Sequence, residues 1–388
     1  MATNDILLVT NYFPPEKGAA ANRMLSLAEA LVNHKMKVAV VCPLPNYPTG
    51  SIYSTFKGKL YAEEAKGDIT IYRLWVWPSN SSNKFIRLLS MLSFACSLSL
   101  FFLFGKIPPK VFVQYSPVFV GFTAVWFAWL FRKKIVLNIS DLWPLAGLEM
   151  GLLKKGSYYR LLEKMERFCY RKAHLVVGQS KEILTHVSSY YPNKKMLLYR
   201  NLPRFDAAAP KETKHTTTIT LVYAGLLGVA QGLYTICKHI DFSENVSLHL
   251  YGNGPEAAAI AALNKPNIHY HGEVSREQLH TLLIQHDIAF IPLVKRIYGS
   301  VPSKIFEYTR LGLPVLYNAG GEGEKLVVTH ELGWVLPVQD MDALQAFVNS
   351  LSLEKLSVYP KNKVQQRALQ AFDFDTQFSE FFRSIEAL

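Results

Sequence analysis

The chain has 388 residues, of which 49% are hydrophobic, and it includes 23 Phe and 20 Tyr. This composition excludes a disordered protein and predicts at least two domains with sizeable cores. The net charge of +12 is unevenly distributed: residues 1–200 hold 26 Lys and Arg against 11 Asp and Glu, and residues 201–388 hold 16 against 19. The basic half is therefore expected to meet an anionic partner, either nucleic acid or lipid.

The first 200 residues predict a doubly wound α/β sheet. The apolar run "DILLVTNYF" has the length of a buried parallel strand, "NRMLSLAEALVNHKM" has helical periodicity, and "KVAVVCP" is a second strand. Further strands are expected at "VFVQYS", "KIVLNIS" and "HLVVGQS". This order of strand, helix and strand is typical of Rossmann-like domains.

The pattern restarts after a polar stretch at 203–218, with strands expected at "ITLVYAGLLG", "VSLHLYGNG", "NIHYHGEV", "IAFIPL" and "LPVLYN". We therefore predict an α/β protein with two Rossmann-like domains facing across a cleft. Residues 1–205 form the first domain and 206–370 the second. A helix in 371–388 is expected to pack back on the first.

Residues 86–104, "IRLLSMLSFACSLSLFFLF", form a long apolar segment with a single charge, and 117–131 is a shorter one. They could be a hairpin buried against the sheet, a helix that spans a bilayer, or helices that dip into one leaflet. We favour the last, because Trp75, Trp77, Trp126 and Trp129 and many basic residues occur in this half. This interpretation predicts an anionic membrane as the partner and no nucleic acid.

The stretch "VPSKIFE" places Ser303, Lys304 and Glu307 at the expected start of a helix. Ser303 is a candidate N-cap, and a lysine among free N–H groups is suited to a diphosphate. A glutamate one turn further can accept hydrogen bonds from a ribose diol. A capped surface helix with a solvated Lys–Glu pair is the alternative.

Small residues follow other strands of the second domain, in "AGLLGVAQG" and "YGNGPE". Glycines there would let the backbone approach a phosphate, and ligands of open α/β sheets bind at the carboxyl ends of strands. These candidates are Gly225, Gly228, Gly252 and Gly254. In the first domain, the loop and helix start after the first strand supply Gly18, Ala19, Asn22 and Arg23, and Asp141 ends another strand.

The whole chain resembles the retaining glycosyltransferases of family four, which have the glycosyltransferase-B fold, and in particular those that add amino sugars during O-antigen or capsule assembly. The resemblance is carried by "NYFPPEKGAAANRM", "SDLWP", "AGLLGVAQGL", "YGNGPE", "VPSKIFEYTRLGLPVL" and "GEGEKLV".

The resemblance implies that the second domain binds a nucleotide sugar, here a UDP-linked one, with Lys304 at the diphosphate and Glu307 at the ribose. The loop of Gly321, Glu322 and Gly323 would meet the sugar or the diphosphate, and whether Glu322 or Glu324 contacts the sugar stays open. The first domain would bind a sugar carried on a polyprenyl diphosphate, with Asp141 near the reacting centre. The implied enzyme is a hexosyl- or N-acetylhexosaminyl-transferase at the cytoplasmic face of the inner membrane.

The chain departs from the family at three positions, with Gly299 where a glutamate is common and Leu226 and Gln231 where Arg and Lys are common. Gln231 is kept as a donor-binding candidate. We expect no cofactor and no metal ion, because no Asp-x-Asp lies where it could bridge metal to diphosphate, and His269 and His271 have no third ligand nearby. A nucleotide-sugar epimerase of the same fold and a non-catalytic sugar-nucleotide-binding protein are the alternatives.

Overall fold

The computed structural model describes residues 4–16, 18–81, 83–207, 209–210 and 218–388. It shows an α/β chain that divides into two compact units, residues 1–201 with 375–388, and residues 202–374. We predicted boundaries after residues 205 and 370, whereas the units change after 201 and 374. Residues 208 and 211–217 of the predicted linker lie outside the described residues.

The first unit is built on a sheet with the strand order β3-β4-β2-β1-β5-β6-β7-β8. Its strands are β1 Ile6–Val9, β2 Val38–Pro43, β3 Tyr61–Lys66, β4 Ile69–Leu74, β5 Lys110–Gln114, β6 Lys134–Ile139, β7 Leu175–Gly178 and β8 Met196–Leu198. Neighbouring strands are parallel except for the edge pair β3 and β4, which the sequence reasoning missed. The central strands β1 and β2 are buried along their whole length, as continuous apolar runs predict.

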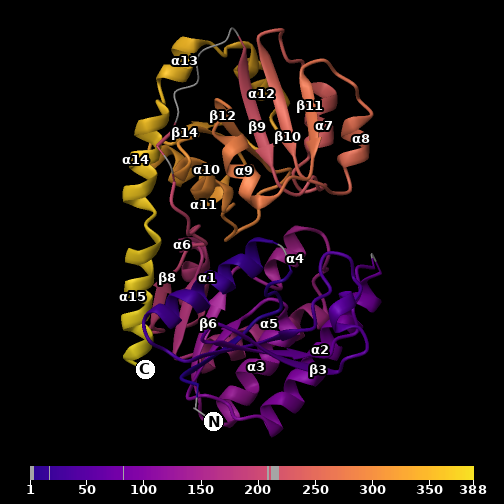
Figure 1. Ribbon diagram of the computed structural model, residues 1–388, viewed down its shortest axis with the longest axis vertical. Helices are drawn as coiled ribbons and strands as arrows, with labels where there is room; N and C mark the ends of the chain where they lie inside the picture. Colours follow the sequence, from indigo (N-terminus) through magenta and orange to yellow (C-terminus); the bar gives the residue numbers. More distant parts are fainter. Residues whose placement is uncertain (1–3, 17, 82, 208, 211–217) are drawn as a thin grey trace. The chain divides into compact units, whose positions relative to one another are not determined.

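Helices cover this sheet (Figure 1). They are α1 Ala19–Asn33, α2 Lys84–Phe104, α3 Val118–Leu130, α4 Leu145–Glu149, α5 Ser157–Lys172, α6 Lys181–Tyr190 and α15 Phe374–Glu386, with a short 3-10 turn at Ser54–Phe56. Helix α3 packs against α2, α5 and the strands β5 and β6. The α2, α3 and α5 layer therefore brings both long apolar segments to one part of the unit.

The C-terminal helix α15 belongs to the first unit, where we expected it, although it follows the second unit in the chain. Phe381 is fully buried, with its ring 5.9 Å from that of Phe112 in β5 and 4.9 Å from that of Tyr199. The Gln377 side chain also accepts a hydrogen bond from the backbone N–H of Arg200. Apolar packing and this hydrogen bond hold the end of the chain on the unit where it began.

Helix α2 has two different apolar faces. Phe94, Leu98 and Phe102 are buried, and the ring of Phe102 stacks on Phe127 of α3 at 5.9 Å. The opposite face exposes a stripe of apolar side chains, which we call the α2 stripe: Phe85, Ile86, Leu92, Leu100, Leu103 and Phe104. One face of the helix is therefore packed in the core and the opposite face is exposed, so the helix is neither a wholly buried hairpin nor a helix surrounded by lipid.

The second unit has the strand order β11-β10-β9-β12-β13-β14, with every neighbouring pair parallel. The strands are β9 Ile219–Ala224, β10 Val246–Tyr251, β11 Ile268–Gly272, β12 Ile288–Pro292, β13 Val315–Asn318 and β14 Gly333–Val335. The helices are α7 Leu233–His239, α8 Ala257–Ala261, α9 Arg276–Leu283, α10 Lys304–Arg310, α11 Gly321–Thr329, α12 Met341–Asn349, α13 Leu353–Ser357 and α14 Lys361–Ala371.

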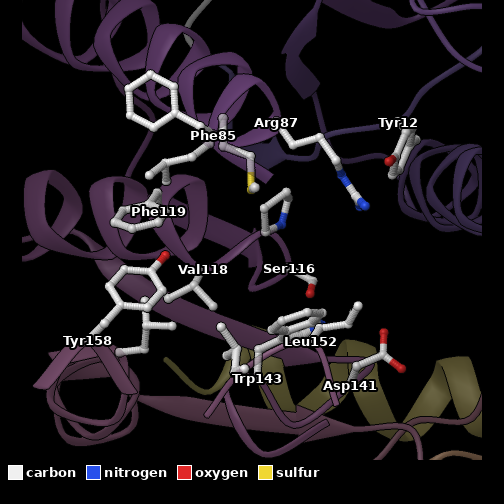
Figure 2. Close-up of a pocket in the computed structure, with 15 residues that line it drawn as sticks. Tyr12, Phe85, Arg87, Ser116, Val118, Phe119, Asp141, Trp143, Leu152 and Tyr158 are labelled. Carbon is white, nitrogen blue, oxygen red and sulfur yellow. The ribbon is translucent and has the colours of Figure 1, made fainter. Parts of the chain in front are cut away.

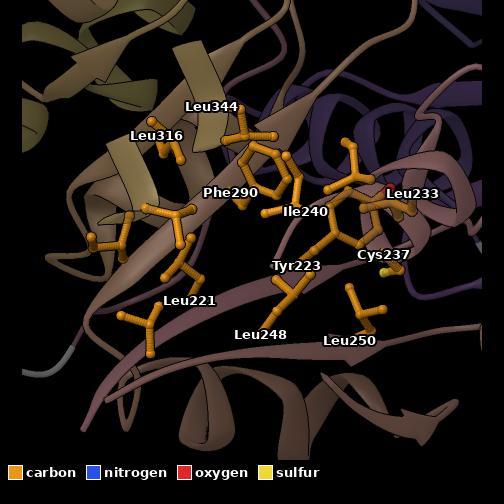
Figure 3. Packing of buried hydrophobic residues seen from close by; sticks show 14 of the residues in the cluster. Leu221, Tyr223, Leu233, Cys237, Ile240, Leu248, Leu250, Phe290, Leu316 and Leu344 are labelled. Atoms are coloured by element: carbon orange, nitrogen blue, oxygen red, sulfur yellow. The ribbon is translucent and has the colours of Figure 1, made fainter. Parts of the chain in front are cut away.

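The core of the second unit lies between one face of this sheet and helices α7, α8 and α12. Figure 3 shows Leu221, Leu248 and Phe290 of three adjacent strands meeting Leu344 of α12 and Ile240, just after α7. Alternate residues of each strand build this face, which is the periodicity that the sequence predicts for strands. The two units each match the doubly wound α/β class that we predicted.

Four histidines gather on the other face of the β10 and β11 edge. The His249 ring lies 4.7 Å from His269, 5.2 Å from His271 and 4.6 Å from His286, and its Nδ1 is 2.9 Å from Nε2 of His271. The pKa of His249 is lowered to about 3 and that of His286 to about 4, chiefly by burial, with smaller contributions from neighbouring imidazoles and, for His286, from Lys361. The folded protein therefore holds these rings neutral at a pH where the unfolded chain protonates them.

The second unit is expected to lose stability as the pH falls from about 6.5 toward 4, because the unfolded state then binds more protons than the folded state. Thermal unfolding midpoints measured across this range should fall with pH, and His249→Gln should make the fall shallower. His239→Gln, at an exposed histidine on α7, is the matched control. Equal pH slopes for the wild type and both variants would contradict this expectation.

Candidate functional site

Lys304 is the first residue of α10 and lies at the carboxyl end of β9. Its Nζ is 5.2 Å from the centre of the Tyr223 ring and contacts the position of Gly225. Nζ makes no hydrogen bond or ion pair within the described part of the chain, and burial lowers the Lys304 pKa, with Glu307 opposing the shift. A desolvated ammonium that forms no ion pair in the described residues is suited to binding an anion.

Tyr308 fixes α10 in this position. Its hydroxyl accepts a hydrogen bond from the N–H of Ala224 at 2.9 Å and donates one to the Ala224 carbonyl at 3.1 Å. Tyr308 is 1% exposed, so both bonds are shielded from water. This residue ties the helix that carries Lys304 to the last residue of β9, and the sequence reasoning missed it.

The glycines that follow β9 and β10 have two different roles. Gly225 has φ +143°, and a Cβ there would collide with Nζ of Lys304. Gly252 and Gly254 also have positive φ, but a Cβ on them would meet the backbone carbonyls of Gly225 and Leu227. Gly252 and Gly254 therefore let the two loops pack backbone against backbone. Their predicted role in leaving room for a phosphate stays a prediction.

Gly228 and Gln231 lie on the same loop, next to each other. A Cβ on Gly228 would be 3.0 Å from Oε1 of Gln231, so the glycine makes room for that amide. Oε1 of Gln231 is buried and has no hydrogen-bond partner in the described residues. An unsatisfied buried acceptor fits a site that a donor group of a ligand completes.

Glu307 is half-buried and accepts a hydrogen bond from Nε2 of His280, in α9, at 3.0 Å. The sequence reasoning did not find His280, because it is 27 residues away and no local pattern marks it. Ser303 is the N-cap residue of α10, as predicted, but its side chain makes no capping hydrogen bond. That prediction fails in its detail because Ser303 already has helical backbone angles.

Helix α11 begins with the loop predicted to meet the sugar or the diphosphate. Gly320 and Gly321 have φ +65° and +72°, and a Cβ on Gly321 would be 3.2 Å from Nε of Arg296. Gly323 is a packing glycine, because a Cβ there would meet the Tyr317 hydroxyl and Ile305. Arg296 therefore brings to the start of α11 a cation that the sequence analysis did not identify.

The two glutamates of this loop have different surroundings. Glu322 is 5% exposed, whereas Glu324 is exposed on the surface of α11. Both lie in the first turn, where carboxylates stabilise the helix. The contact of this loop with the sugar or the diphosphate stays a prediction, and the choice between Glu322 and Glu324 stays open.

In the first unit, Asp141 follows β6 and lines a cavity of about 660 Å³ (Figure 2). Its carboxylate makes no hydrogen bond or ion pair with any residue that the structure describes. Burial raises its pKa, and the positive charge of Arg23 opposes that rise. A carboxyl with a raised pKa in a cavity is suited to accepting a proton or orienting a hydroxyl.

Arg23 lies behind Asp141, in a polar network at the ends of β5 and β6. Its Nη2 donates to Oε1 of Gln114 at 2.7 Å and to Oγ of Ser140 at 2.8 Å. Gln114 also donates to Ser140 at 2.6 Å and accepts from Asn138. Arg23, predicted with Gly18, Ala19 and Asn22 on the acceptor side of the first domain, also organises the strand ends beneath Asp141.

The loop before α1 leaves open space. A Cβ on Gly18, which has φ +140°, would meet nothing within 4 Å. Gly18 and Ala19 border a small cavity of about 200 Å³ with Tyr12 and Tyr47, and Asn22 is half-buried in the first turn of α1. Tyr12 lines this cavity and the larger one as well.

Two family models match the chain. Residues 18–201 match the glycosyl transferase 4-like domain, and residues 218–353 match the glycosyl transferases group 1 domain. The chain belongs to the glycosyltransferases. No curated protein sequence matches it.

Solved structures of glycosyltransferase-B enzymes resemble this glycosyltransferase over its full length. A sucrose-phosphate synthase from Thermosynechococcus elongatus is 14% identical, with 99% of each chain covered and a TM-score of 0.72. HepE from Anabaena, in complex with UDP, is 14% identical over 99% of this chain and 100% of its own, with a TM-score of 0.68. WaaG, a glycosyltransferase involved in lipopolysaccharide biosynthesis, is 12% identical over 95% of this chain and 96% of its own, with a TM-score of 0.63. These likenesses confirm the predicted fold. The resemblance to the family-four glycosyltransferases is confirmed by the two family models.

Glu307→Gln is expected to weaken UDP binding about tenfold by calorimetry, since a hydrogen bond to a charged group is worth roughly 1.5–3 kcal/mol and the neutral amide retains part of it. The loss should disappear for 2′,3′-dideoxy-UDP, which lacks the diol. Glu354→Gln, at an exposed position of α13, is the control. An equal loss for both nucleotides would show that Glu307 does not bind the ribose.

Proposed function

We propose that this glycosyltransferase moves a hexose or N-acetylhexosamine from a UDP-linked donor to a sugar carried on a polyprenyl diphosphate, with retention of configuration and without a metal ion. The reaction would take place at the cytoplasmic face of the inner membrane, in the synthesis of a bacterial surface polysaccharide such as O-antigen or capsule. The observation that carries the lipid-linked acceptor is the exposed α2 stripe, which lies in the same unit as Asp141.

Helix α2, which carries the α2 stripe, has the length and composition of a membrane-contacting helix. Residues Phe85–Phe104 have a mean hydropathy of 1.9, and 22% of that window is buried. By length and composition, this is the one helix among the described residues that could cross a membrane. Helices in the core of a soluble protein can have the same length and composition. Because its other face is core, we propose that the helix lies in the lipid interface and does not cross the bilayer.

Aromatic and basic side chains accompany the stripe. Trp126 and Trp129 of α3 are both exposed and contact Phe168 of α5, and Nζ of Lys172 lies 3.8 Å from the centre of the Trp129 ring. Exposed basic residues continue along α5: Arg160, Lys164, Arg167 and Arg171. Tryptophan is enriched at the headgroup level of membranes, and each basic residue near an anionic leaflet contributes about 1 kcal/mol.

The donor half of the proposal rests on Lys304 and on the comparison with HepE, which was solved in complexes with UDP and with UDP-glucose. Lys304, with Arg296 nearby at the start of α11, would stabilise the negative charge of the leaving diphosphate. This would supply electrostatic stabilisation where other enzymes use a metal ion, and no group of three or more His, Cys, Asp or Glu suited to a metal occurs in the described residues.

The proposed reaction breaks the bond between the anomeric carbon and the diphosphate oxygen, and the electron pair leaves with the diphosphate. The acceptor oxygen forms the new bond on the same face, and its proton passes to the departing diphosphate. Asp141 would accept a hydrogen bond from the acceptor hydroxyl and hold it in position. A covalent glycosyl-enzyme on Asp141 is the other route to retention.

Transfer from UDP-sugars to a prenyl-diphosphate-linked sugar should occur in the presence of a chelator, and the product should retain the anomeric configuration. Mass spectrometry of the lipid product and NMR of the new linkage test both points. Complete loss in chelator with recovery on adding Mg²⁺ would contradict metal independence. Interconversion of nucleotide sugars would indicate an epimerase, and binding without turnover would indicate a non-catalytic protein.

The protein is expected to float with vesicles that contain anionic lipid, and to be released by salt as screening increases. Replacing Leu100, Leu103 and Phe104 by Ser should abolish flotation and leave folding intact, since all three are more than half exposed. Phe102 must be retained, because it is core.

The matched control replaces three exposed apolar residues of the second unit, Val229, Val328 and Val358, by Ser. This variant should float like the wild type. Equal recovery with neutral and anionic vesicles would contradict the electrostatic part of the proposal, and equal loss in both triple variants would contradict the role of the α2 stripe.

A further inference from the structure

The cavity beside Asp141 is amphipathic. Tyr12, Arg87, Ser116 and Asp141 lie along one side of it, whereas Phe119, Trp143, Leu152 and Tyr158 enclose the rest (Figure 2). Its volume of about 660 Å³ is within the range of small-molecule sites, roughly 300–1,000 Å³. A ligand that fills it therefore needs a polar end and a larger apolar body.

Arg87 supplies the positive charge at the polar side. It is exposed, and its guanidinium makes no hydrogen bond or ion pair with another residue that the structure describes. The Asp141 carboxylate lies on the same side of the cavity (Figure 2). A polar group that meets both residues should carry a negative charge for Arg87 and a hydroxyl for Asp141.

The apolar side is continuous with the membrane-facing helix. Phe85, Leu88 and Met91 of α2 line the cavity, and Phe85 also belongs to the exposed α2 stripe. The apolar surface of α2 therefore continues from the stripe into the cavity through Phe85. A nucleotide or a free sugar would leave this apolar lining without a partner.

We propose that the cavity binds the first isoprenoid units of the acceptor lipid, with the diphosphate at Arg87 and the acceptor hydroxyl at Asp141. This inference rests on the lipid-linked acceptor proposed above and makes it specific. Because Asp141 itself lines the cavity that holds the hydrocarbon, the saccharide between the lipid and the reacting hydroxyl must be short. The enzyme would thus act on a lipid that carries one or two sugars.

Calorimetry with farnesyl diphosphate, inorganic diphosphate and farnesol tests the binding site directly. Farnesyl diphosphate should bind at least tenfold more tightly than either of the others. Leu152→Glu should reduce that affinity at least tenfold, and Leu152 is exposed enough to accept the change without unfolding the protein. Arg87→Gln should weaken farnesyl diphosphate binding and leave farnesol binding unchanged.

Leu161→Glu is the matched control, because Leu161 is an exposed apolar residue of α5 that does not line the cavity. It should bind farnesyl diphosphate like the wild type, and all three variants should bind UDP with unchanged affinity. Equal losses for Leu152→Glu and Leu161→Glu, or farnesyl diphosphate binding no tighter than diphosphate, would overturn the proposal.

Transfer assays separate this inference from the proposed function. A farnesyl-diphosphate acceptor with one sugar should have a KM at least tenfold lower than a similar acceptor with five sugars. Efficient transfer without this preference would overturn the inference and leave the glycosyltransferase activity standing. Tight, Leu152-dependent binding of farnesyl diphosphate without transfer from any nucleotide sugar would uphold the lipid site and contradict the proposed function.

Discussion

The buried ammonium of Lys304, which forms no ion pair in the described residues, is the feature on which the second unit's site depends. Burial lowers its pKa, and in the described residues its only charged neighbour of note is Glu307, one turn along the helix. Keeping a charge in such a position costs free energy. The Tyr308 hydroxyl, which bonds both backbone groups of Ala224, holds the helix that carries Lys304 at the end of β9. Gly225 then leaves room for the amine at the strand end. An anion bound beside Lys304 would stabilise the desolvated ammonium. The burial that fixes the lysine in position is therefore also what favours anion binding.

The sequence predicted those parts of this site that depend on residues close together in the chain. The apolar runs gave the buried strands, and the helix beginning at Lys304 follows from "VPSKIFE". Tyr308, His280 and Arg296 were missed because each acts through a contact with residues distant in sequence, such as Ala224, 84 positions away. The packing role of Gly252 and Gly254 could not be predicted, because a glycine needed for loop packing has the same sequence signature as one needed for a ligand.

Hydropathy alone could not resolve helix α2. The segment is apolar all round, and only the packed structure separates the buried face of Phe94, Leu98 and Phe102 from the exposed α2 stripe. The cavity beside Asp141 was equally beyond sequence reasoning, since its lining comes from five separate segments between Tyr12 and Leu162. Asp141 itself was found because it ends a predicted strand, which is where α/β sheets place their functional residues.

The most direct test of the central claim compares UDP with uridine in the wild type and in Lys304→Met, which removes the charge and keeps most of the side-chain volume. We expect UDP affinity to fall ten- to a hundredfold, because a hydrogen bond to a charged group is worth roughly 1.5–3 kcal/mol, and uridine affinity to change less than about threefold. An equal change for both ligands, or none for UDP, would contradict the assignment of Lys304 to the diphosphate.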